Sequence, residues 1–365
     1  MSWSNHIYDW TIFGAKCAGA LVVFGLYQLY INQDNILYIP NPPGMPKTPD
    51  ENPKYLRSPL EWTVSGNRAT SQTPMMEKLT FLEEFIVTDD NISIHTWIIL
   101  QKESRKCPTL VYFHGNAGNM GFRLPNAAQM YAKAGINIVM VDYRGYGASS
   151  GTPNEKGLNL DGEAVIKFLS KHPKLNGSKL IMFGRSLGGA VAISLAHKFP
   201  ELVSGVIVEN TFLSIAAMVD TLMPLIAPAK GLILRIGWHS ETLIKDLKQP
   251  IMFISGLKDE LVPPVHMKKL HKLAVRSKYR YWFEVPTGTH NETFIAAGMQ
   301  YYLRLKEFCL IVDSGVSDNN DGDNNNNNNS GSNDVKYVGR GGEDNGGSSA
   351  EIGSIPTMTK NLNVK

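Results

Sequence analysis

The sequence predicts an α/β protein with a mostly parallel central sheet and helices on both faces of that sheet. Short apolar runs alternate with segments of helical pattern between residues 79 and 313. Continuous apolar runs, without polar alternation, are typical of strands buried on both faces, which is how parallel sheets are built. The chain has 365 residues, more than one small domain needs, so we expect a single domain of this class with appendages.

The elements of this domain are expected in alternating order along the chain. The first is a hairpin over 85–100, which turns around Asp89, Asp90 and Asn91. The strands that follow are expected at 109–115, 136–143, 179–184, 203–209, 250–256 and 279–286. The helices are expected at 122–134, 156–171, 187–198, 264–275 and 291–310. In such a sheet, catalytic groups belong at the carboxyl ends of the strands.

The N-terminal appendage predicts a membrane anchor. Residues 10–31 are apolar apart from Lys16 and Gln28, and this run is long enough to cross a bilayer. A helix that belongs to the domain is the alternative, whereas no small-x-small site follows that would indicate a cleaved signal peptide. We therefore expect an N-terminal tail at 1–9 and a transmembrane signal anchor at 10–31.

Two further segments flank the domain, which is expected at 79–313. Residues 32–78 form a stalk and lead-in, and their proline-rich part, 39–53, predicts an extended spacer that lifts the domain off the membrane. Residues 314–365 are rich in Asn, Gly, Ser and Asp and have few apolar side chains to bury. This composition predicts a disordered tail.

Charge and cysteine content exclude several classes of partner. The net charge is only +3 and is dispersed, so we expect no nucleic-acid binding. The three cysteines, Cys17, Cys107 and Cys309, cannot all pair, and none has a metal-like spacing. We therefore expect no metal and no cofactor. The expected partners are a small-molecule, lipid or acylated-protein substrate, and a membrane that the N-terminal helix crosses.

The segment GRSLGG, residues 184–189, carries the strongest chemical signal. The pattern GxSxG is weak by itself, but here it lies between an apolar strand and an apolar helix, which is the setting of the nucleophile elbow in the α/β-hydrolase fold. Gly184 and Gly188 allow the tight turn, and the helix N-terminus favours developing negative charge. Ser186 is therefore the candidate nucleophile, with an incidental serine in a glycine-rich turn as the alternative.

Two candidate partners follow Ser186 in the order Ser, Asp, His that this fold uses. Asp259 and His290 each come just after an expected strand. A serine nucleophile needs a base such as histidine, and the histidine needs an acid that orients it. Glu260 is a rival for the acid. His266 is a rival for the base, although its position in an expected helix predicts a solvated side chain.

The negative charge that develops on a substrate oxygen needs two backbone N–H donors. Leu187, which follows the nucleophile, is one candidate. The other belongs to the glycine-containing loop 114–119, where Asn116 is the first candidate and Ala117 the second.

A small helical cap is expected over 211–245, where this fold commonly carries an insertion. Its apolar residues predict either a slot for an acyl chain or ordinary packing on the sheet. This part of the sequence leaves lipid esters, thioesters and small soluble esters open.

The motifs FHGNAGN, VDYRGYGASSG, GRSLGG, SGLKDELVPP and GTHNET occur in this order. Together they make the chain resemble the α/β-hydrolase domain-containing protein 13 family, over roughly residues 10–310. The resemblance implies a single-pass type II membrane protein whose catalytic triad falls on Ser186, Asp259 and His290. It implies no particular substrate.

We therefore expect a membrane-anchored serine hydrolase that cleaves an ester or thioester bond through an acyl-enzyme. A non-catalytic binding protein of the same fold and a peptidase are the alternatives. Sequons at Asn91, Asn176 and Asn291 predict N-glycans if the domain faces a lumen or the cell exterior. A fourth sequon, at Asn328, lies inside the asparagine run of the tail.

Overall fold

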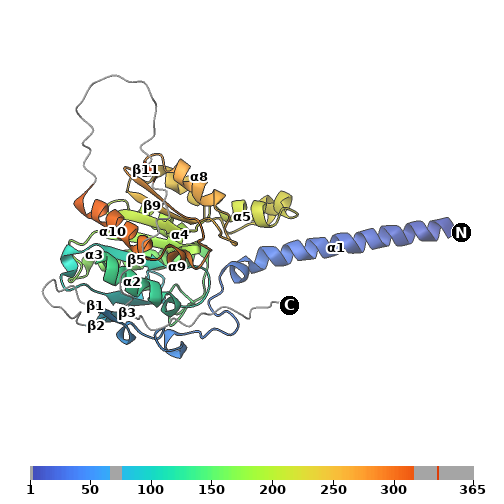
Figure 1. The fold of residues 1–365 in the computed structure, drawn as a ribbon. Helices are drawn as coiled ribbons and strands as arrows, with labels where there is room; N and C mark the ends of the chain where they lie inside the picture. The colour runs from blue at the N-terminus through green and yellow to red at the C-terminus, as the bar shows by residue number, and fades with distance from the viewer. Residues whose placement is uncertain (1–2, 66–75, 316–334, 337–365) are drawn as a thin grey trace, which may run out of the picture.

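The computed structural model describes residues 3–65, 76–315 and 335–336. Its centre is a nine-stranded sheet in the order β11-β10-β9-β8-β7-β5-β6-β4-β3 (Figure 1). The strand β3 pairs antiparallel with β4, and β4 pairs antiparallel with β6. The pairs from β6 across to β11 are parallel. The predicted class, a mostly parallel α/β sheet, is confirmed.

The strands β4 to β10 lie close to the predicted limits, whereas β3 begins four residues before the expected hairpin and β11 was not predicted. The strands of this sheet are β3 Phe81–Val87, β4 Ser93–Ile99, β5 Thr109–Phe113, β6 Asn137–Val141, β7 Leu180–Arg185, β8 Val203–Glu209, β9 Ile251–Gly256, β10 Arg280–Val285 and β11 Val335–Lys336. A separate two-stranded sheet, which was not predicted, pairs β1 Thr63–Ser65 with β2 Met76–Lys78. Strands of three residues are too short to show a periodic pattern.

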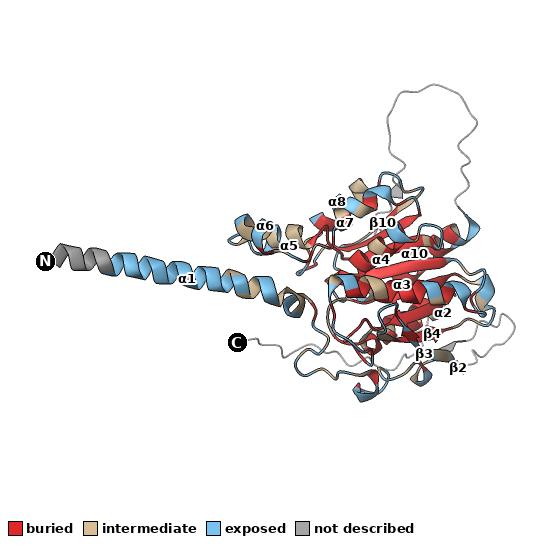
Figure 2. Cartoon of the chain, turned by 180° about the vertical axis from the view of Figure 1, so that it is seen from behind, coloured by how far each residue is buried: buried red, intermediate tan, exposed pale blue. Residues whose placement is uncertain are grey.

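Helices cover both faces of the sheet. Figure 2 shows the buried strands, in red, between these helices. The longer ones are α2 Leu124–Ala134, α3 Glu155–Lys171, α4 Leu187–Lys198, α8 Val265–Leu273 and α10 Met299–Ser314, and α9 Thr293–Ala297 is a short helix of five residues. The single helix expected over 291–310 is two helices, because Gly298 between them adopts φ +55°. Short 3-10 turns are η1 Pro49–Glu51, η2 Pro59–Glu61, η3 Ser104–Lys106, η4 Met120–Arg123, η5 Ala227–Ala229 and η6 Ile244–Asp246.

Each face of the sheet has its own hydrophobic core. On one face α3, α4 and α8 pack against the sheet, with buried side chains such as Ile166, Val191 and Leu270. On the other face α2 and α10 do so, with Met130 and Phe308 among the buried residues. Strands with apolar side chains on both faces leave only their ends free for polar chemistry, so the site belongs at an edge.

Between β8 and β9 the chain forms a small helical cap, as expected. It comprises α5 Ile215–Leu222, α6 Lys230–Ile233 and α7 Ser240–Leu243. Ser214 begins α5 by accepting a hydrogen bond from the N–H of Ala217. Glu155, at the start of α3, accepts the N–H groups of Gly237 and Trp238, which fixes the end of the cap on the domain.

The N-terminal helix α1, Trp3–Leu37, extends away from the domain into open space (Figure 1). It is longer than the apolar run at 10–31 because polar residues after Ile31 continue the same helix. Its part Trp10–Leu37 is long and apolar enough to cross a membrane. Large apolar side chains of α1 such as Leu21 and Phe24 are exposed.

The prediction that residues 39–53 form an extended spacer is wrong. Ile39 pairs with Ala117 in a β-bridge on the domain. Asn52 is fully buried, and its side-chain amide exchanges hydrogen bonds with that of Asn119 at 2.8 and 3.2 Å. These contacts join residues far apart in sequence, so proline content alone gave no sign of them. The segment is part of the domain surface and does not separate the domain from α1.

The predicted disorder of 314–365 falls almost wholly outside the described residues. Val335 and Lys336 are described, and they pair in parallel with Tyr281 and Trp282 of β10. The tail prediction did not include this strand.

Replacing Asn52 with alanine should loosen the segment 39–53. Removal of the buried amide leaves the side chain of Asn119 without one of its partners, which costs about 1–3 kcal/mol. We expect the melting temperature of the full-length protein in detergent to fall by several °C. Asn41→Ala, at an exposed position of the same segment, is the matched control and should leave it unchanged. Equal melting temperatures for both variants would contradict the assigned role of Asn52.

Candidate active site

Ser186 lies at the sharp turn between β7 and α4 that GRSLGG predicts. Its backbone adopts φ 54° and ψ −121°, a conformation that costs a non-glycine residue about 1–3 kcal/mol. A Cβ on Gly184 would lie 2.0 Å from the carbonyl oxygen of Gly188. A Cβ on Gly188 would lie 2.0 Å from the carbonyl oxygen of Phe113. Glycine is therefore required on both sides of the serine.

Asp259 and His290 form a buried pair at the same edge of the sheet. His290 Nδ1 lies 2.8 Å from Asp259 Oδ2 and 3.0 Å from Oδ1. Asp259 Oδ1 also accepts the backbone N–H groups of Leu261 and Val262 at 2.9 and 2.8 Å. The carboxylate is thus held by its own loop, and a proton on Nδ1 leaves Nε2 of the imidazole free to accept another.

The two rivals have other contacts. Glu260 Oε2 accepts the backbone N–H of His290 at 3.1 Å, so this acid contacts the main chain of the histidine and not its ring. His266 is buried and its Nδ1 accepts the N–H of Leu213 at 3.3 Å, so the prediction that it is solvated is wrong. Its helix packs under the cap, and burial lowers the pKa of its imidazole below the usual 6.5.

The predicted nucleophile, base and oxyanion donors line one cavity of about 350 Å³. Ser186 and His290 face it together with Asn116 and Leu187. Neither the N–H of Asn116 nor that of Leu187 donates a hydrogen bond to a residue that the structure describes. Asn116 is fixed in place because its carbonyl oxygen accepts the hydroxyl of Tyr146 at 2.8 Å. Two N–H groups are therefore available beside the serine.

A buried ion pair that sequence reasoning missed supports this arrangement. Arg185 pairs with Glu209 at 3.0 Å, and Tyr301 donates its hydroxyl to the same carboxylate at 2.6 Å. Arg185 also donates to the carbonyl oxygen of Asn291 at 3.1 Å. This contact joins the residue before the nucleophile to the residue after His290, so it fixes the two loops relative to one another.

Asn210, at the end of β8, fixes the histidine loop from the other side. Its amide nitrogen donates to the carbonyl oxygens of Thr289 and His290 at 3.0 and 3.1 Å. Its amide oxygen accepts the N–H of Gly256 at 2.8 Å. A polar residue directly after a buried strand, in VIVEN, is the sequence signal that could have marked it.

The rest of the cavity wall is apolar apart from Gln33, and it includes a segment that was expected to be separate. The cap contributes Ile215, Met218, Val219, Leu222, Met223, Ile226, Ile233, Leu234 and Ile236. Helix α1 contributes Leu29, Gln33, Ile36 and Leu37. Phe212, Leu261 and Val262 complete the lining. The proposed anchor and the site therefore meet in one cavity.

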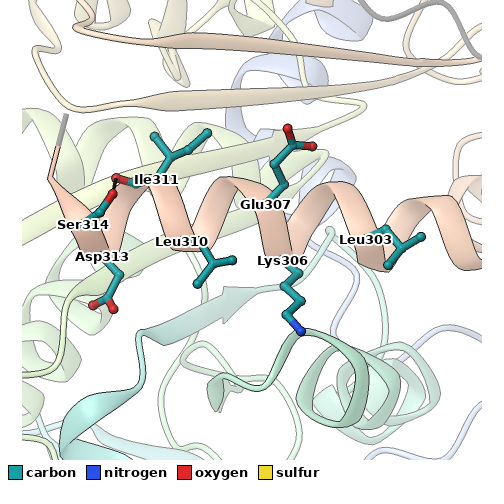
Figure 3. Close-up of a pocket in the computed structure, with 7 residues that line it drawn as sticks. All are labelled: Leu303, Lys306, Glu307, Leu310, Ile311, Asp313 and Ser314. Atoms are coloured by element: carbon teal, nitrogen blue, oxygen red, sulfur yellow. Dashed lines mark hydrogen bonds between the residues drawn. The ribbon is translucent and has the colours of Figure 1, made fainter. Parts of the chain in front are cut away.

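A second hollow lies along α10 and is shown in Figure 3. Its described lining comes from this helix alone, Leu303 to Ser314. The side chains in Figure 3 spread along the helix and do not converge on a common centre. The cavity at Ser186 is therefore the candidate active site.

Comparison with known proteins identifies the family. A family model described as serine aminopeptidase, S33, matches residues 104–239. The α/β-hydrolase domain-containing protein WAV2 of Arabidopsis thaliana is 34% identical over 296 residues, which cover 78% of this chain and 89% of WAV2. The chain belongs to the α/β-hydrolase domain-containing protein 13 family. Protein bem46 of Schizosaccharomyces pombe is 37% identical over 245 residues, 67% of this chain and 81% of bem46.

Solved structures share the fold of this family member. The Pyrococcus furiosus esterase Pf2001 has a TM-score of 0.52 at 18% identity, over 63% of this chain and 91% of the esterase. Est1E of Butyrivibrio proteoclasticus, solved with ferulic acid, has a TM-score of 0.51 at 19% identity, over 63% of this chain and 99% of Est1E. The α/β-hydrolase fold is thereby confirmed, and hydrolysis is the class of reaction that the family supports.

Proposed function

We propose that the protein is a membrane-anchored serine hydrolase that cleaves an acyl ester or thioester through a covalent acyl-enzyme. The observation that carries this proposal is the buried Asp259–His290 pair, whose histidine lines the same cavity as Ser186. A serine, a base and an orienting acid at the strand ends are what nucleophilic acyl transfer requires.

In the proposed reaction Ser186 Oγ attacks the acyl carbonyl carbon while His290 Nε2 takes the hydroxyl proton. Asp259 stabilises the imidazolium that forms. The N–H groups of Asn116 and Leu187 donate to the oxyanion of the tetrahedral intermediate. His290 then gives the proton to the departing oxygen or sulfur, and the acyl-enzyme remains. Water, deprotonated by His290, attacks this ester and releases the free acid and the serine.

The composition of the cavity favours an acyl substrate over a peptide. An aminopeptidase must bind a positively charged amino terminus, and carboxylates are the groups that pair with such a charge. No Asp or Glu lines the cavity within the part of the chain that the structure describes. The description of the matching family model as an aminopeptidase is therefore weak support for peptide cleavage here.

We further propose a type II orientation, with residues 1–9 in the cytosol, α1 across the bilayer and the domain on the opposite side. The apolar exposed helix Trp10–Leu37 supports an anchor. A relative from Saccharomyces cerevisiae, 38% identical over 249 residues, is described as a membrane protein. In this orientation the domain is accessible to N-glycosylation.

Ser186→Ala should abolish labelling by a fluorophosphonate probe and reduce hydrolysis of p-nitrophenyl butyrate by about 10⁴- to 10⁶-fold, because loss of a triad member leaves only binding and the oxyanion donors. Ser170→Ala, at an exposed serine on α3, is the control and should label fully. Full labelling of folded Ser186→Ala would refute the nucleophile. A folded wild-type protein that neither labels nor hydrolyses the ester would indicate the non-catalytic alternative.

Asp259→Asn should lower kcat by about 10⁴-fold with little change in KM, because the imidazole loses the partner that sets its tautomer. Glu260→Gln is the matched control, one residue along the same loop. Since its carboxylate contacts only the backbone N–H of His290 among its described hydrogen bonds, we expect an effect below about tenfold. Steady-state kinetics on p-nitrophenyl butyrate measure both, and a reversed ranking would make Glu260 the acid.

Glycosylation tests the orientation. Asn91, in the turn between β3 and β4, and Asn176, in the loop before β7, are exposed and should carry glycans. Asn91→Gln and Asn176→Gln should each remove one endoglycosidase-sensitive gel shift. Asn291→Gln should remove none, because a glycan beside His290 would crowd the site. An unglycosylated domain that protease digests from the cytosolic face would reverse the orientation, and release by alkaline carbonate would exclude the anchor.

A further inference from the structure

The contribution of α1 to the cavity comes from one face of the helix. Leu29, Gln33, Ile36 and Leu37 are spaced by four, three and one residues, which places them on a single stripe. This stripe begins within the apolar run and ends where the chain enters the domain. It therefore leads continuously from the proposed membrane segment to the cavity that contains Ser186.

Hydrogen bonds fix the end of α1 to the cap. Gln33 donates to the carbonyl oxygen of Ile233 at 2.5 Å and accepts the N–H of Arg235 at 2.8 Å. The guanidinium of Arg235 donates to the carbonyl oxygen of Tyr30 at 2.8 Å and pairs with Asp34 at 3.2 Å. The cap thus lies directly against α1 at residues 30–34.

The end of α1 is also bonded to the loop that carries a candidate oxyanion donor. The side chain of Asn116 donates to the carbonyl oxygen of Leu37 at 3.0 Å, which satisfies one of the free carbonyls at the helix end. The N–H of Ile39 donates back to the carbonyl oxygen of Asn116 at 2.9 Å. The position of α1 and that of the reaction centre are therefore coupled through this residue.

The aromatic residues of α1 set the depth of the cap contact. Trp10 and Tyr30 are 20 residues apart, and at the rise of an α-helix this is about 30 Å, the thickness of a hydrocarbon core. Both are exposed, as residues of an interfacial belt are. With α1 across the bilayer as proposed above, the contact at residues 30–34 would lie at the membrane–water interface, and Leu29 of the cavity at the edge of the hydrocarbon.

The cap has apolar side chains on its outer surface as well as inside. Leu225 and Leu232 are 96% and 85% exposed, and neither lines the cavity. Leu222 and Met223, which do line it, are about half exposed. Leucines so fully exposed on an element that touches a membrane helix are typical of a surface that enters the interface.

We propose that the cavity opens to the bilayer, and that its ligand is the long acyl chain of a membrane lipid ester, which enters sideways between α1 and the cap. The apolar cavity, the α1 stripe, the interfacial depth of the cap and its exposed leucines all support this route. The proposal deepens the proposed function, because it names the substrate class of the same site. The catalytic step is the acyl transfer already described, with the lipid alcohol as leaving group.

Full-length protein in phosphatidylcholine vesicles tests the route with two substrates. One is 1-oleoylglycerol in the bilayer, and the other is p-nitrophenyl butyrate in solution. The double variant Leu225→Asp/Leu232→Asp should lower the rate on oleoylglycerol by more than tenfold and leave the rate on butyrate unchanged. Val275→Asp, at an apolar position 69% exposed outside the cap, is the matched control and should change neither rate.

The other outcomes of this experiment separate failure of the membrane route from failure of the proposed function. Unchanged oleoylglycerol hydrolysis by the double variant would overturn the proposal, and so would an equal loss on both substrates. A wild-type protein that hydrolyses the butyrate but not oleoylglycerol would overturn this proposal and leave the proposed function standing. A preference for a vesicle-bound S-acylated peptide over oleoylglycerol would do the same. A folded wild-type protein that hydrolyses neither substrate and does not react with the fluorophosphonate probe would instead refute the proposed function.

A second variant tests the wall that α1 supplies. In a series of p-nitrophenyl esters, kcat/KM should rise by about fourfold per methylene for as long as the added carbon is buried. Leu29→Trp narrows the cavity and should lower the ratio of the laurate to the butyrate rate by at least tenfold. Ile31→Trp, on an exposed position of the same helix outside the cavity, should leave this ratio as in the wild type. Equal ratios for both variants would exclude α1 as a wall of the acyl site.

Discussion

The strained backbone of Ser186 is the constraint on which the other features of the site depend. A residue with a Cβ at φ 54° keeps this conformation only if its surroundings leave it no alternative. Gly184 and Gly188 allow the strand and the helix to approach within backbone contact, and the serine is fixed between them. The buried Arg185–Glu209 pair then joins this turn to the histidine loop. Breaking such a pair would leave an uncompensated buried charge, so any rearrangement that separates the two loops has a considerable energetic cost.

Much of this site could be predicted because its signals are local. Ser186 lies in a short motif between two patterned elements, and Asp259 and His290 each follow a buried strand in the order that the fold requires. Asp259 was the first candidate for the acid and its neighbour Glu260 the rival. The structure supplies a physical reason for that ranking, since one carboxylate contacts the ring of His290 and the other contacts its backbone. Their catalytic roles stay predictions that kinetics must test.

What could not be predicted depends on contacts between distant residues. Gln33 and Arg235 are 202 residues apart, and no periodic pattern in the sequence predicts the hydrogen bond between them. The hydrogen bonds between the buried side chains of Asn52 and Asn119 could not be predicted either, because asparagine in a proline-rich segment is typical of an exposed loop. His266 was expected in solvent because it lies in a helix before the last predicted strand, yet Leu213 and Thr221 contact its ring and bury it. Assignment of domains by composition therefore separated α1, the segment 39–53 and the cap, which the tertiary contacts join.

The β-bridge at Ile39 has a consequence for proteolytic release. Many anchored domains are set free when a protease cuts the chain between the membrane segment and the fold. Here the carbonyl oxygen of Ile39 accepts the N–H of Gly118 at 3.2 Å, and the N–H of Ile39 donates to the carbonyl oxygen of Asn116. Ile39 precedes the exposed residue Asn41 in the chain, so both bonds lie on the α1 side of a cut there. A cut at Asn41 would leave these bonds and the bonds of Arg235 to α1 in place. Cleavage of the peptide chain at this point would thus nick the protein without shedding it, and the two fragments would stay together as a non-covalent complex.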